Sequence, residues 1–304
     1  MQRRNFIKNS ILATGALTIP LAGSKIFAGC TAAAPKPATG VFKKAMMWES
    51  IGVQGSILDK CMAIKEAGFV GVEPSSHLDR KEMIDALKTT GLTATDVCCS
   101  THWKKRLTDP DAAVRQEAIE GVTVALEDAH AYGTDAILLV PGVVNDNVTY
   151  EDCWKLSTEG INKLLPVAKK LNVQICIENV PNYFLFSPLE AKSYVDQFKT
   201  PFVKFFFDIG NVMHYGWPEQ WINILGDRIG RVHIKEFSRK IADQKGRRAG
   251  LQVALLEGDV NWTKVMEALR KNYRNEWLIA EQPKSNTLEE LQVLIDQFDK
   301  ILSM

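Results

Sequence analysis

The sequence predicts a (β/α)8 barrel, and three observations support this fold class. Short apolar and β-branched runs alternate with longer helical patterns, as repeated βα units on a parallel sheet require. Eight such pairs follow one another within residues 41–304, which fits the strand number and the size of a TIM barrel. No Gly-x-Gly-x-x-Gly motif follows the first strand, which disfavours the alternative, a doubly wound open sheet with a dinucleotide site.

The strands are predicted from short apolar runs. They cover residues 44–48, 69–73, 93–99, 136–140, 173–178, 203–208, 231–235 and 277–281. The helices are predicted from apolar residues three or four positions apart, as one buried helix face requires. They cover residues 57–67, 80–89, 111–132, 151–171, 188–197, 218–225, 262–271 and 288–301. Residues 238–257, which include the basic run 245–248, are expected to form a loop that is a lid, a phosphate binder or a solvated charge run.

Residues 1–30 are predicted to be a bacterial export signal. They hold four basic residues and no acidic one, and an apolar stretch at 11–22 follows the basic start, which is the layout of a signal peptide. This stretch is too short and too interrupted for a spanning helix. The run Arg-Arg-Asn-Phe-Ile-Lys at residues 3–8 resembles the twin-arginine export motif, with an ordinary export signal as the alternative.

Residues 27–30, Phe-Ala-Gly-Cys, resemble a lipobox in which Cys30 would carry a lipid. The alternative is an unmodified Cys30 beside a different cleavage site. Residues 31–40 are rich in Ala, Pro and Thr and are expected to be a linker, so the domain is predicted to cover residues 41–304. The protein is therefore expected to be periplasmic or anchored to the envelope, with a membrane contact only through Cys30.

Composition excludes several classes of protein. With 46% hydrophobic and 24% charged residues, the chain is an ordinary globular protein rather than a disordered or fibrous one. A formal net charge of +1 and the absence of a basic stripe argue against a nucleic-acid partner. The five cysteines beyond Cys30 form no CxxC pair, so we expect them in the core rather than on zinc, with a disulfide left open.

Polar residues end several of the predicted strands. Chemistry in barrels takes place at the carboxyl ends of the strands, where the βα loops converge, so these residues are candidates for an active site. So many carboxylates in one mouth would repel each other, and a divalent cation is their natural neutralising partner. The candidates are Glu73, Glu178, Asp208, His233, Lys235 and Glu281.

Three carboxylates and one imidazole among these candidates form a mixed oxygen and nitrogen ligand set. Without a thiolate, the ligand types suit Mn²⁺, Mg²⁺, Co²⁺ or Zn²⁺, and we expect one ion, with Mn²⁺ favoured over a closed structural zinc site. The four expected ligands are Glu178, Asp208, His233 and Glu281.

From about Val41 to its end, the chain resembles the xylose-isomerase-like TIM-barrel superfamily, which includes ketose 3-epimerases and hydroxypyruvate isomerase. The segments that carry the resemblance are GFVGVEP at 68–74, ICIEN at 175–179, FFFDIGN at 205–211, RVHIKEF at 231–237, EGDVNW at 257–262 and IAEQP at 279–283. The resemblance implies a metal held by the four expected ligands and a homo-oligomer. It also implies that Glu178 and Glu281 exchange a proton with the sugar and that Arg239 contacts the substrate.

The sequence departs from the ketose 3-epimerase pattern at two positions. Asn211 stands where those enzymes have a substrate-binding His, and Phe184 stands where they have a second Glu. A strict ketose 3-epimerase is therefore in doubt, although Asn211 remains a candidate substrate contact. Endonuclease IV shares the barrel, but five histidines are too few for its three-metal cluster and the chain is near neutral.

Five residues are candidates for the pocket around the metal. His102 could bind sugar hydroxyls and Trp103 could stack on a ring, although a surface loop is the alternative. Lys235 shares a strand face with His233 and could polarise a substrate oxygen, or it could form a buried ion pair with Glu73 or Asp208. Glu73 is expected to contact the substrate. His77, four residues past Glu73, could line the mouth, whereas His130 is expected to be structural.

The predicted function is a metal-dependent sugar isomerase or epimerase, which removes a proton next to a carbonyl and passes through an enediolate. Export favours free sugars, glycosides or keto-sugars over sugar phosphates as substrates. A lyase that eliminates the aglycone from 3-keto-glycosides is the alternative with the same site. A sugar-binding barrel without catalytic activity is a third hypothesis.

Overall fold

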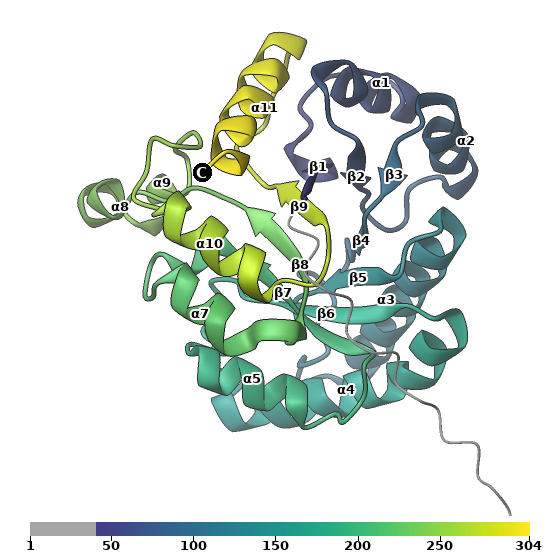
Figure 1. Cartoon of the computed structure of the whole chain (residues 1–304). Helices are drawn as coiled ribbons and strands as arrows, with labels where there is room; N and C mark the ends of the chain where they lie inside the picture. Colours follow the sequence, from purple (N-terminus) through teal and green to yellow (C-terminus); the bar gives the residue numbers. More distant parts are fainter. Residues whose placement is uncertain (1–40) are drawn as a thin grey trace, which may run out of the picture. The chain divides into compact units, whose positions relative to one another are not determined.

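The computed structural model describes residues 41–304, shown in colour in Figure 1. The predicted signal peptide at residues 1–30, with its twin-arginine run and Cys30, lies outside the described residues, as does the linker at 31–40. None of the helices within residues 41–304 combines the length and the apolar character that crossing a bilayer needs.

Nine parallel strands form one sheet within the described residues, in the order β3-β2-β1-β9-β8-β7-β6-β5-β4. Helices surround this sheet, as Figure 1 shows. The strands are β1 Lys43–Met47, β2 Gly71–Glu73, β3 Thr93–Ala94, β4 Val97–Cys98, β5 Ala136–Leu139, β6 Gln174–Glu178, β7 Val203–Asp208, β8 Ile229–Ile234 and β9 Trp277–Ala280. Each neighbouring pair in this order runs in parallel, as the repeated βα pattern predicts.

The two edges of this sheet come from a single predicted strand. Strands β3 and β4 are the two halves of the run at 93–99, which Thr95 and Asp96 interrupt. The N–H of Cys98 donates to the carbonyl of Pro74 at 2.9 Å, and the N–H of Ser76 donates to the carbonyl of Cys98 at 2.8 Å. The end of β2 therefore pairs with β4 as well as with β3, and the sheet closes as the predicted barrel, with its third strand in two pieces.

The helices follow the strands with bounds close to the predicted ones. They are α1 Ile57–Ala67, α2 Arg80–Thr90, α3 Ala112–Tyr132, α4 Tyr150–Leu171, α5 Pro188–Asp196, α6 Ile209–Val212, α7 Pro218–Leu225, α8 Arg239–Lys245, α9 Arg247–Gly250, α10 Trp262–Asn272 and α11 Leu288–Leu302. Two short 3₁₀ helices, η1 Trp48–Ser50 and η2 Gly226–Arg228, complete the described elements. Helices α8 and α9 replace the loop that we expected at 238–257, and Ser238 caps α8 by accepting from the N–H of Ile241.

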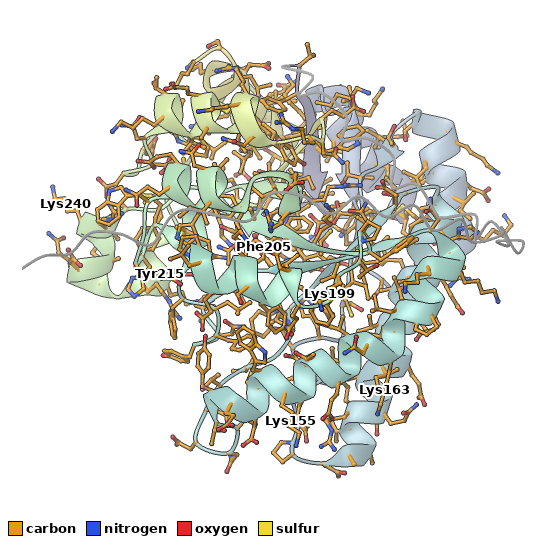
Figure 2. The ribbon with its side chains drawn as sticks, turned by 60° about the horizontal axis from the view of Figure 1, so that its bottom comes forward. Lys155, Lys163, Lys199, Phe205, Tyr215 and Lys240 are labelled. Atoms are coloured by element: carbon orange, nitrogen blue, oxygen red, sulfur yellow. The ribbon has the colours of Figure 1, made fainter. Side chains whose placement is uncertain are left out.

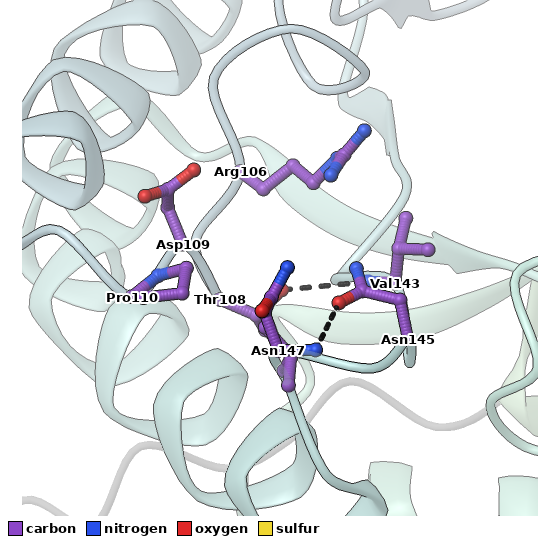
Figure 3. Close-up of a pocket in the computed structure, with 8 residues that line it drawn as sticks. Arg106, Thr108, Asp109, Pro110, Val143, Asn145 and Asn147 are labelled. Atoms are coloured by element: carbon purple, nitrogen blue, oxygen red, sulfur yellow. Dashed lines mark hydrogen bonds between the residues drawn. The ribbon is translucent and has the colours of Figure 1, made fainter.

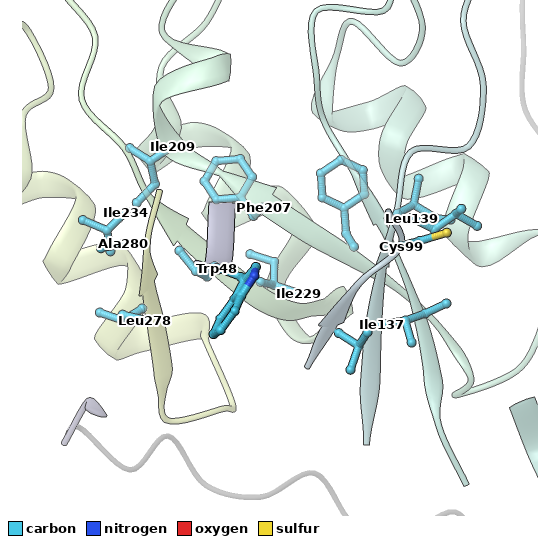
Figure 4. Close-up of a cluster of buried hydrophobic side chains, with 14 of the residues drawn as sticks. Trp48, Cys99, Ile137, Leu139, Phe207, Ile209, Ile229, Ile234, Leu278 and Ala280 are labelled. Atoms are coloured by element: carbon cyan, nitrogen blue, oxygen red, sulfur yellow. The ribbon is translucent and has the colours of Figure 1, made fainter. Parts of the chain in front are cut away.

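Side chains inside the barrel alternate along each strand with side chains that face the helices. Phe206 belongs to a small inner cluster of buried side chains, whereas Phe205 and Phe207 belong to the large cluster between the strands and the helices. Figure 4 shows part of the large cluster, including Phe207 and Ile209. The period of two residues therefore assigns every second side chain of a strand to the barrel interior.

The outer helix faces carry the charges. Figure 2 shows Lys155 and Lys163 on α4, away from the strands, while Phe205 lies on the strand between the layers. All five cysteines of the described residues are buried with free thiols, as expected for core residues.

Arg231 fills the amino-terminal end of the barrel interior. Its guanidinium donates twice to the carbonyl of Thr95, at 2.8 and 2.7 Å, and also to the carbonyl of Gly230 and to the carboxylate of Asp135. Thr95 lies in the break between β3 and β4, and Asp135 directly precedes β5. One buried side chain therefore links β8 to the strands on the opposite side of the barrel.

Replacing Arg231 with Met should lower the free energy of unfolding by about 1–3 kcal/mol, because the buried carbonyl of Thr95 would lose its charged donor. Urea unfolding followed by circular dichroism measures this difference. Arg248→Met, at an exposed arginine, is the control and should change stability by less than about 0.5 kcal/mol. Equal unfolding midpoints for the two variants would contradict this role of Arg231.

Candidate active site

The candidate ligands lie inside the barrel because each follows an inward-facing residue by two positions. Cys176 and Phe206 belong to the inner cluster, so Glu178 and Asp208 continue the same faces of β6 and β7 to their carboxyl ends. On β8, His233 pairs in register with Asp208. Parallel strands in this register bring side chains from different strands to one level.

Four side chains converge there, as the sequence predicts. One ligand atom from each of Glu178, Asp208, His233 and Glu281 lies within 4.8 Å of all the others. The Nδ1 atom of His233 is 2.9 Å from Glu281 Oε2, 3.4 Å from Glu178 Oε1 and 3.9 Å from Asp208 Oδ2. We call these four residues the ligand group.

The ligand group fits a divalent cation. Asp208 Oδ2, His233 Nδ1 and Glu281 Oε2 are all buried, and none of these atoms has a hydrogen-bond partner within residues 41–304. Buried polar atoms are normally paired, and orphaned ones at one point indicate an ion. Carboxylate oxygens with one imidazole suit Mn²⁺, Mg²⁺, Co²⁺ and Zn²⁺ alike, so these residues could hold a metal whose identity the ligand types leave open.

Glu73 holds the other side of the His233 ring. Its Oε2 atom lies 2.7 Å from His233 Nε2, and both side chains are fully buried. A ring that donates its Nε2–H to this carboxylate presents the Nδ1 lone pair to the ligand group, which is the usual arrangement at metal-binding histidines. Glu73 does not line the pocket, so the structure makes it a positioning residue for His233 rather than the substrate contact that we expected.

Charge repulsion and burial shift the pKa values of these groups. Burial raises the pKa of Glu178 and, well above its usual value, that of Asp208. Burial lowers the pKa of His233, but Glu73 and Glu281 outweigh it and raise that pKa well above its usual value. These side chains together therefore favour positive charge at Nδ1, where a cation would bind.

Lys235 supplies positive charge to the same cluster. Its Nζ atom lies 2.5 Å from Glu281 Oε1 and 3.4 Å from Asp208 Oδ2. Burial works to raise the pKa of Glu281, but Lys235 and His233 hold it well below the usual value. Of the ion pairs that were the alternative for Lys235, the one with Asp208 is thus present and the one with Glu73 is not, and the closer partner is Glu281. Lys235 is partly buried and also lines the pocket.

Two asparagines hold Asp208 in place. Asn179 exchanges two hydrogen bonds with the main chain of Asp208, at 2.8 and 2.9 Å. The Oδ1 atom of Asp208 caps α6 by accepting from the N–H of Asn211 at 2.7 Å, which leaves Oδ2 for the ligand group. Asn211 donates to the carbonyl of Asn179, while its own buried Oδ1 atom has no partner among the described residues.

A pocket of about 400 Å³ opens above the ligand group. Glu178 and Glu281 line it, whereas Asp208 and His233 lie behind them and do not. The other lining residues that matter for the site are Lys235, Asn211, His102, Trp103, Glu49, Ser75, Cys98 and Leu251.

His102 and Trp103 form one wall of the pocket, with their rings edge to face at 5.5 Å. His102 is buried, and its Nδ1 atom accepts from the N–H of Val140 at 3.3 Å. Burial lowers its pKa to about 3, so the ring is neutral and its Nε2–H remains a donor. The surface-loop alternative for His102 is therefore wrong.

Arg239 does not line the pocket. Its guanidinium donates to the carbonyls of Met213 and Gly216, at 3.0 and 2.7 Å, and stacks on Trp217 at 5.2 Å. The first residue of α8 thus holds the loop between α6 and α7. His77 and His130 also lie outside the pocket lining, and His130 bonds to the carbonyl of Leu171, as a structural residue would.

Glu49 and Ser75 are pocket residues that our sequence analysis missed. Ser75 donates to Glu49 Oε1 at 2.7 Å, across the ends of β1 and β2. Glu49 directly follows the strand predicted at 44–48, so the rule that found the other strand-end carboxylates also applies to it. Asn179 was missed in the same way, although it directly follows Glu178.

The family model of the xylose isomerase-like TIM barrel matches residues 61–298, and the chain belongs to this family. Among curated proteins, L-ribulose-5-phosphate 3-epimerase UlaE of Escherichia coli O1:K1 / APEC is 24% identical over 231 residues, which are 71% of this chain and 78% of UlaE. The homologues are thus sugar epimerases.

Two solved structures share the fold. The 3-keto-D-glucoside 4-epimerase YcjR from E. coli superposes with a TM-score of 0.73 at 17% identity, over 86% of this chain and 100% of YcjR. The IolI protein with a bound zinc atom superposes with a TM-score of 0.71 at 15% identity, over 86% of this chain and 98% of IolI. At these identities the two structures support the barrel and nothing finer.

Replacing Glu73 with Gln should weaken metal binding about 10- to 100-fold, because the carboxylate that orients a ligating histidine would be lost. Titration calorimetry with Mn²⁺ measures the affinity. Glu49→Gln is the matched control, since the carboxylate of Glu49 lines the pocket and bonds to Ser75 rather than to His233, and its affinity should be unchanged. Equal Mn²⁺ affinity in Glu73→Gln and the wild type would contradict the positioning role.

His102 should make the fold less stable in acid. Its pKa in the folded protein, about 3, lies below the ordinary value of 6.5, so the unfolded chain binds the proton first. The stability that the neutral ring confers is present above pH 6.5 and is lost as the pH falls toward 3, by about 2 kcal/mol between pH 6.5 and 5. Urea unfolding at both pH values should show a smaller loss in His102→Asn. The same loss in both proteins would argue against a buried neutral ring.

Proposed function

We propose that this protein is a divalent-metal-dependent sugar epimerase or isomerase that moves a proton at a carbon next to a carbonyl. The observation that carries the proposal is the convergence of three orphaned ligand atoms and Glu178 beneath a pocket that Glu178 and Glu281 line. UlaE and YcjR, which are named as epimerases of a ketose phosphate and of a keto-glucoside, support a substrate with a carbonyl group.

Glu178, Asp208, His233 and Glu281 would hold the ion, and Mn²⁺ is our choice among the ions that these ligand types suit. When bound, the ion would supply a Lewis acid for a sugar carbonyl and its neighbouring hydroxyl group. Asn179 and Glu73 keep two of the ligands oriented. The remaining steps depend on the side chains of the pocket.

Glu178 and Glu281 are our choice for the acid and base groups. Of the ligand group, only these two line the pocket, so only their carboxylates can reach a substrate carbon. One would take the proton from the carbon next to the carbonyl, and the other would return a proton to the enediolate from its own side. A positioned carboxylate contributes about 10²- to 10⁴-fold in such a step.

Four further pocket residues would bind the sugar. The ammonium of Lys235, 2.5 Å from Glu281, can donate to a sugar oxygen next to the reacting carbon. The neutral Nε2–H of His102 and the orphaned Oδ1 of Asn211 offer one donor and one acceptor to hydroxyl groups. Trp103, which is 45% exposed, offers a ring face for a sugar ring.

A lyase acting on 3-keto-glycosides is the second candidate function. Removing a proton next to a ketone leads to elimination when a leaving group stands on the following carbon. The departure at Phe184 favours this candidate over a strict ketose 3-epimerase. Its ring is 3% exposed and packs against Tyr150, Trp154 and Tyr194, so this position gives the pocket no carboxylate.

The compartment in which the protein acts is inferred from the sequence alone. We infer export by the twin-arginine route and action in the periplasm or at the envelope, with a lipid on Cys30 as the only membrane contact. That compartment favours free sugars, glycosides and keto-sugars as substrates. A homo-oligomer is part of the same proposal, and nucleic acid is not a partner in it.

Replacing Glu178 or Glu281 with Gln should lower proton exchange with solvent about 10²- to 10⁴-fold, because the amide cannot take the proton. The measurement is deuterium incorporation from D₂O into free and keto-sugars, followed by NMR, with metal content determined in parallel. Only variants that retain metal are interpreted. The control Glu49→Gln removes a pocket carboxylate outside the ligand group and should retain exchange within about tenfold.

If the metal-loaded Glu178→Gln and Glu281→Gln variants each retain proton exchange, the assignment of these two residues as acid and base is refuted. The products separate the two candidate functions. A changed stereocentre in the recovered sugar supports the epimerase, and release of the aglycone from a 3-keto-glucoside supports the lyase. Sugar binding that survives EDTA without any exchange would instead favour a barrel that binds sugar without catalysis.

A further inference from the structure

A second pocket, of about 480 Å³, lies in the loops that follow β4 and β5 (Figure 3). These loops leave the carboxyl ends of their strands, which is the edge of the barrel where the ligand group lies. None of the ligand group lines this pocket. Its principal lining residues are Arg106, Thr108, Asp109, Val143, Asn145 and Asn147.

The second pocket adjoins the first through short stretches of chain. Trp103 lines the first pocket and Arg106 the second, and the Nε–H of Arg106 donates to the carbonyl of Trp103 at 3.2 Å. On the other wall, the N–H of Val144 donates to the carbonyl of Asn182, which directly follows Pro181 of the first pocket. Trp103 therefore links the two pockets through its carbonyl, and we call it the boundary residue.

The loop backbone of the second pocket is held by its own hydrogen bonds. Val143 N–H donates to Thr108 Oγ1 at 3.4 Å, and Asn147 N–H donates to Asn145 Oδ1 at 2.9 Å, as the dashed lines in Figure 3 mark. Within residues 41–304, the side-chain amide of Asn147 and the terminal nitrogens of Arg106 make no hydrogen bond or ion pair. Donors and acceptors thus remain available in a pocket whose walls are already fixed.

The chemistry of these side chains suits a neutral polyol. Amide groups both donate and accept, as sugar hydroxyl groups do, and the guanidinium of Arg106 adds donors. Asp109 offers an acceptor to hydroxyl groups. The same carboxylate would repel a phosphate or another anion, so an anion site is disfavoured although an arginine is present.

We propose that this second pocket binds the second ring of a disaccharide or glycoside whose first ring occupies the pocket above the ligand group. The inference rests on the proposed function for the first ring only. It restricts the substrate class to sugars with two rings, and the boundary residue Trp103 would contact both. Free monosaccharides would then fill only half of the available site.

The test compares two-ring sugars with their single rings on the full-length, metal-loaded protein. Sucrose, maltose and lactose, each also oxidised to a ketone at carbon 3, are compared with glucose, fructose and galactose. Binding is measured by saturation-transfer NMR and calorimetry, and proton exchange is measured in D₂O. The wild type should prefer the two-ring sugars.

Asn147→Ala and Arg106→Ala should each lower the ratio of two-ring to one-ring affinity about 10-fold, through lost hydrogen bonds. Asn147→Ala removes a side chain without a hydrogen bond of its own, so misfolding is a small risk. Arg274→Ala is the matched control. Its guanidinium also donates to the carbonyl three residues earlier, that of Lys271 at 2.9 Å, and its ratio should stay at the wild-type value.

Equal affinity for one-ring and two-ring sugars, or a two-ring preference that both variants retain, would overturn the inference. Displacement of the second ring by inorganic phosphate would overturn it in favour of an anion site. Absence of proton exchange with every sugar would refute the proposed function alone. The affinity ratios would then still decide whether the second pocket binds a ring.

Discussion

The contact between Glu73 and His233 is the interaction on which the site depends. It buries a carboxylate and an imidazole completely, 2.7 Å apart, at the centre of the barrel. Because Glu73 binds Nε2, the ring turns Nδ1 toward Glu178, Asp208 and Glu281. Without this contact a neutral histidine could rotate, and the carboxylates of the ligand group would face each other with Lys235 as their only nearby cation among the described residues.

The four members of the ligand group could be predicted because two simple rules act together. The period of two residues selects the inward face of each strand, and parallel register brings the strand ends to one level. Asp208 and His233 are even paired directly across β7 and β8. The same rules could not give the role of Glu73, because its partner lies on β8, across the barrel from β2, and the distance between those strands is not written in the sequence.

Local backbone geometry and one tertiary contact explain two further differences between the predicted and the observed structure. The family resemblance implied a substrate contact for Arg239, but Ser238 caps α8, which begins at Arg239, and the guanidinium donates to the carbonyls of Met213 and Gly216. The third strand could not be predicted as two pieces, because apolar residues stand on both sides of Thr95 and Asp96 and read as one continuous strand. Their break is held by a tertiary contact, from the guanidinium of Arg231 to the carbonyl of Thr95.

Charge balance connects this geometry with base chemistry. Glu73, Glu178, Asp208 and Glu281 carry four negative charges when ionised, while a divalent ion and Lys235 would supply three positive ones. One negative charge then remains, and a base requires such a charge. Of these four carboxylates, Asp208 and Glu73 do not line the pocket, so within this cluster the remaining charge is available to a substrate only on Glu178 or Glu281. The arrangement that buries Asp208 and Glu73 therefore leaves the other two carboxylates of the cluster facing the substrate.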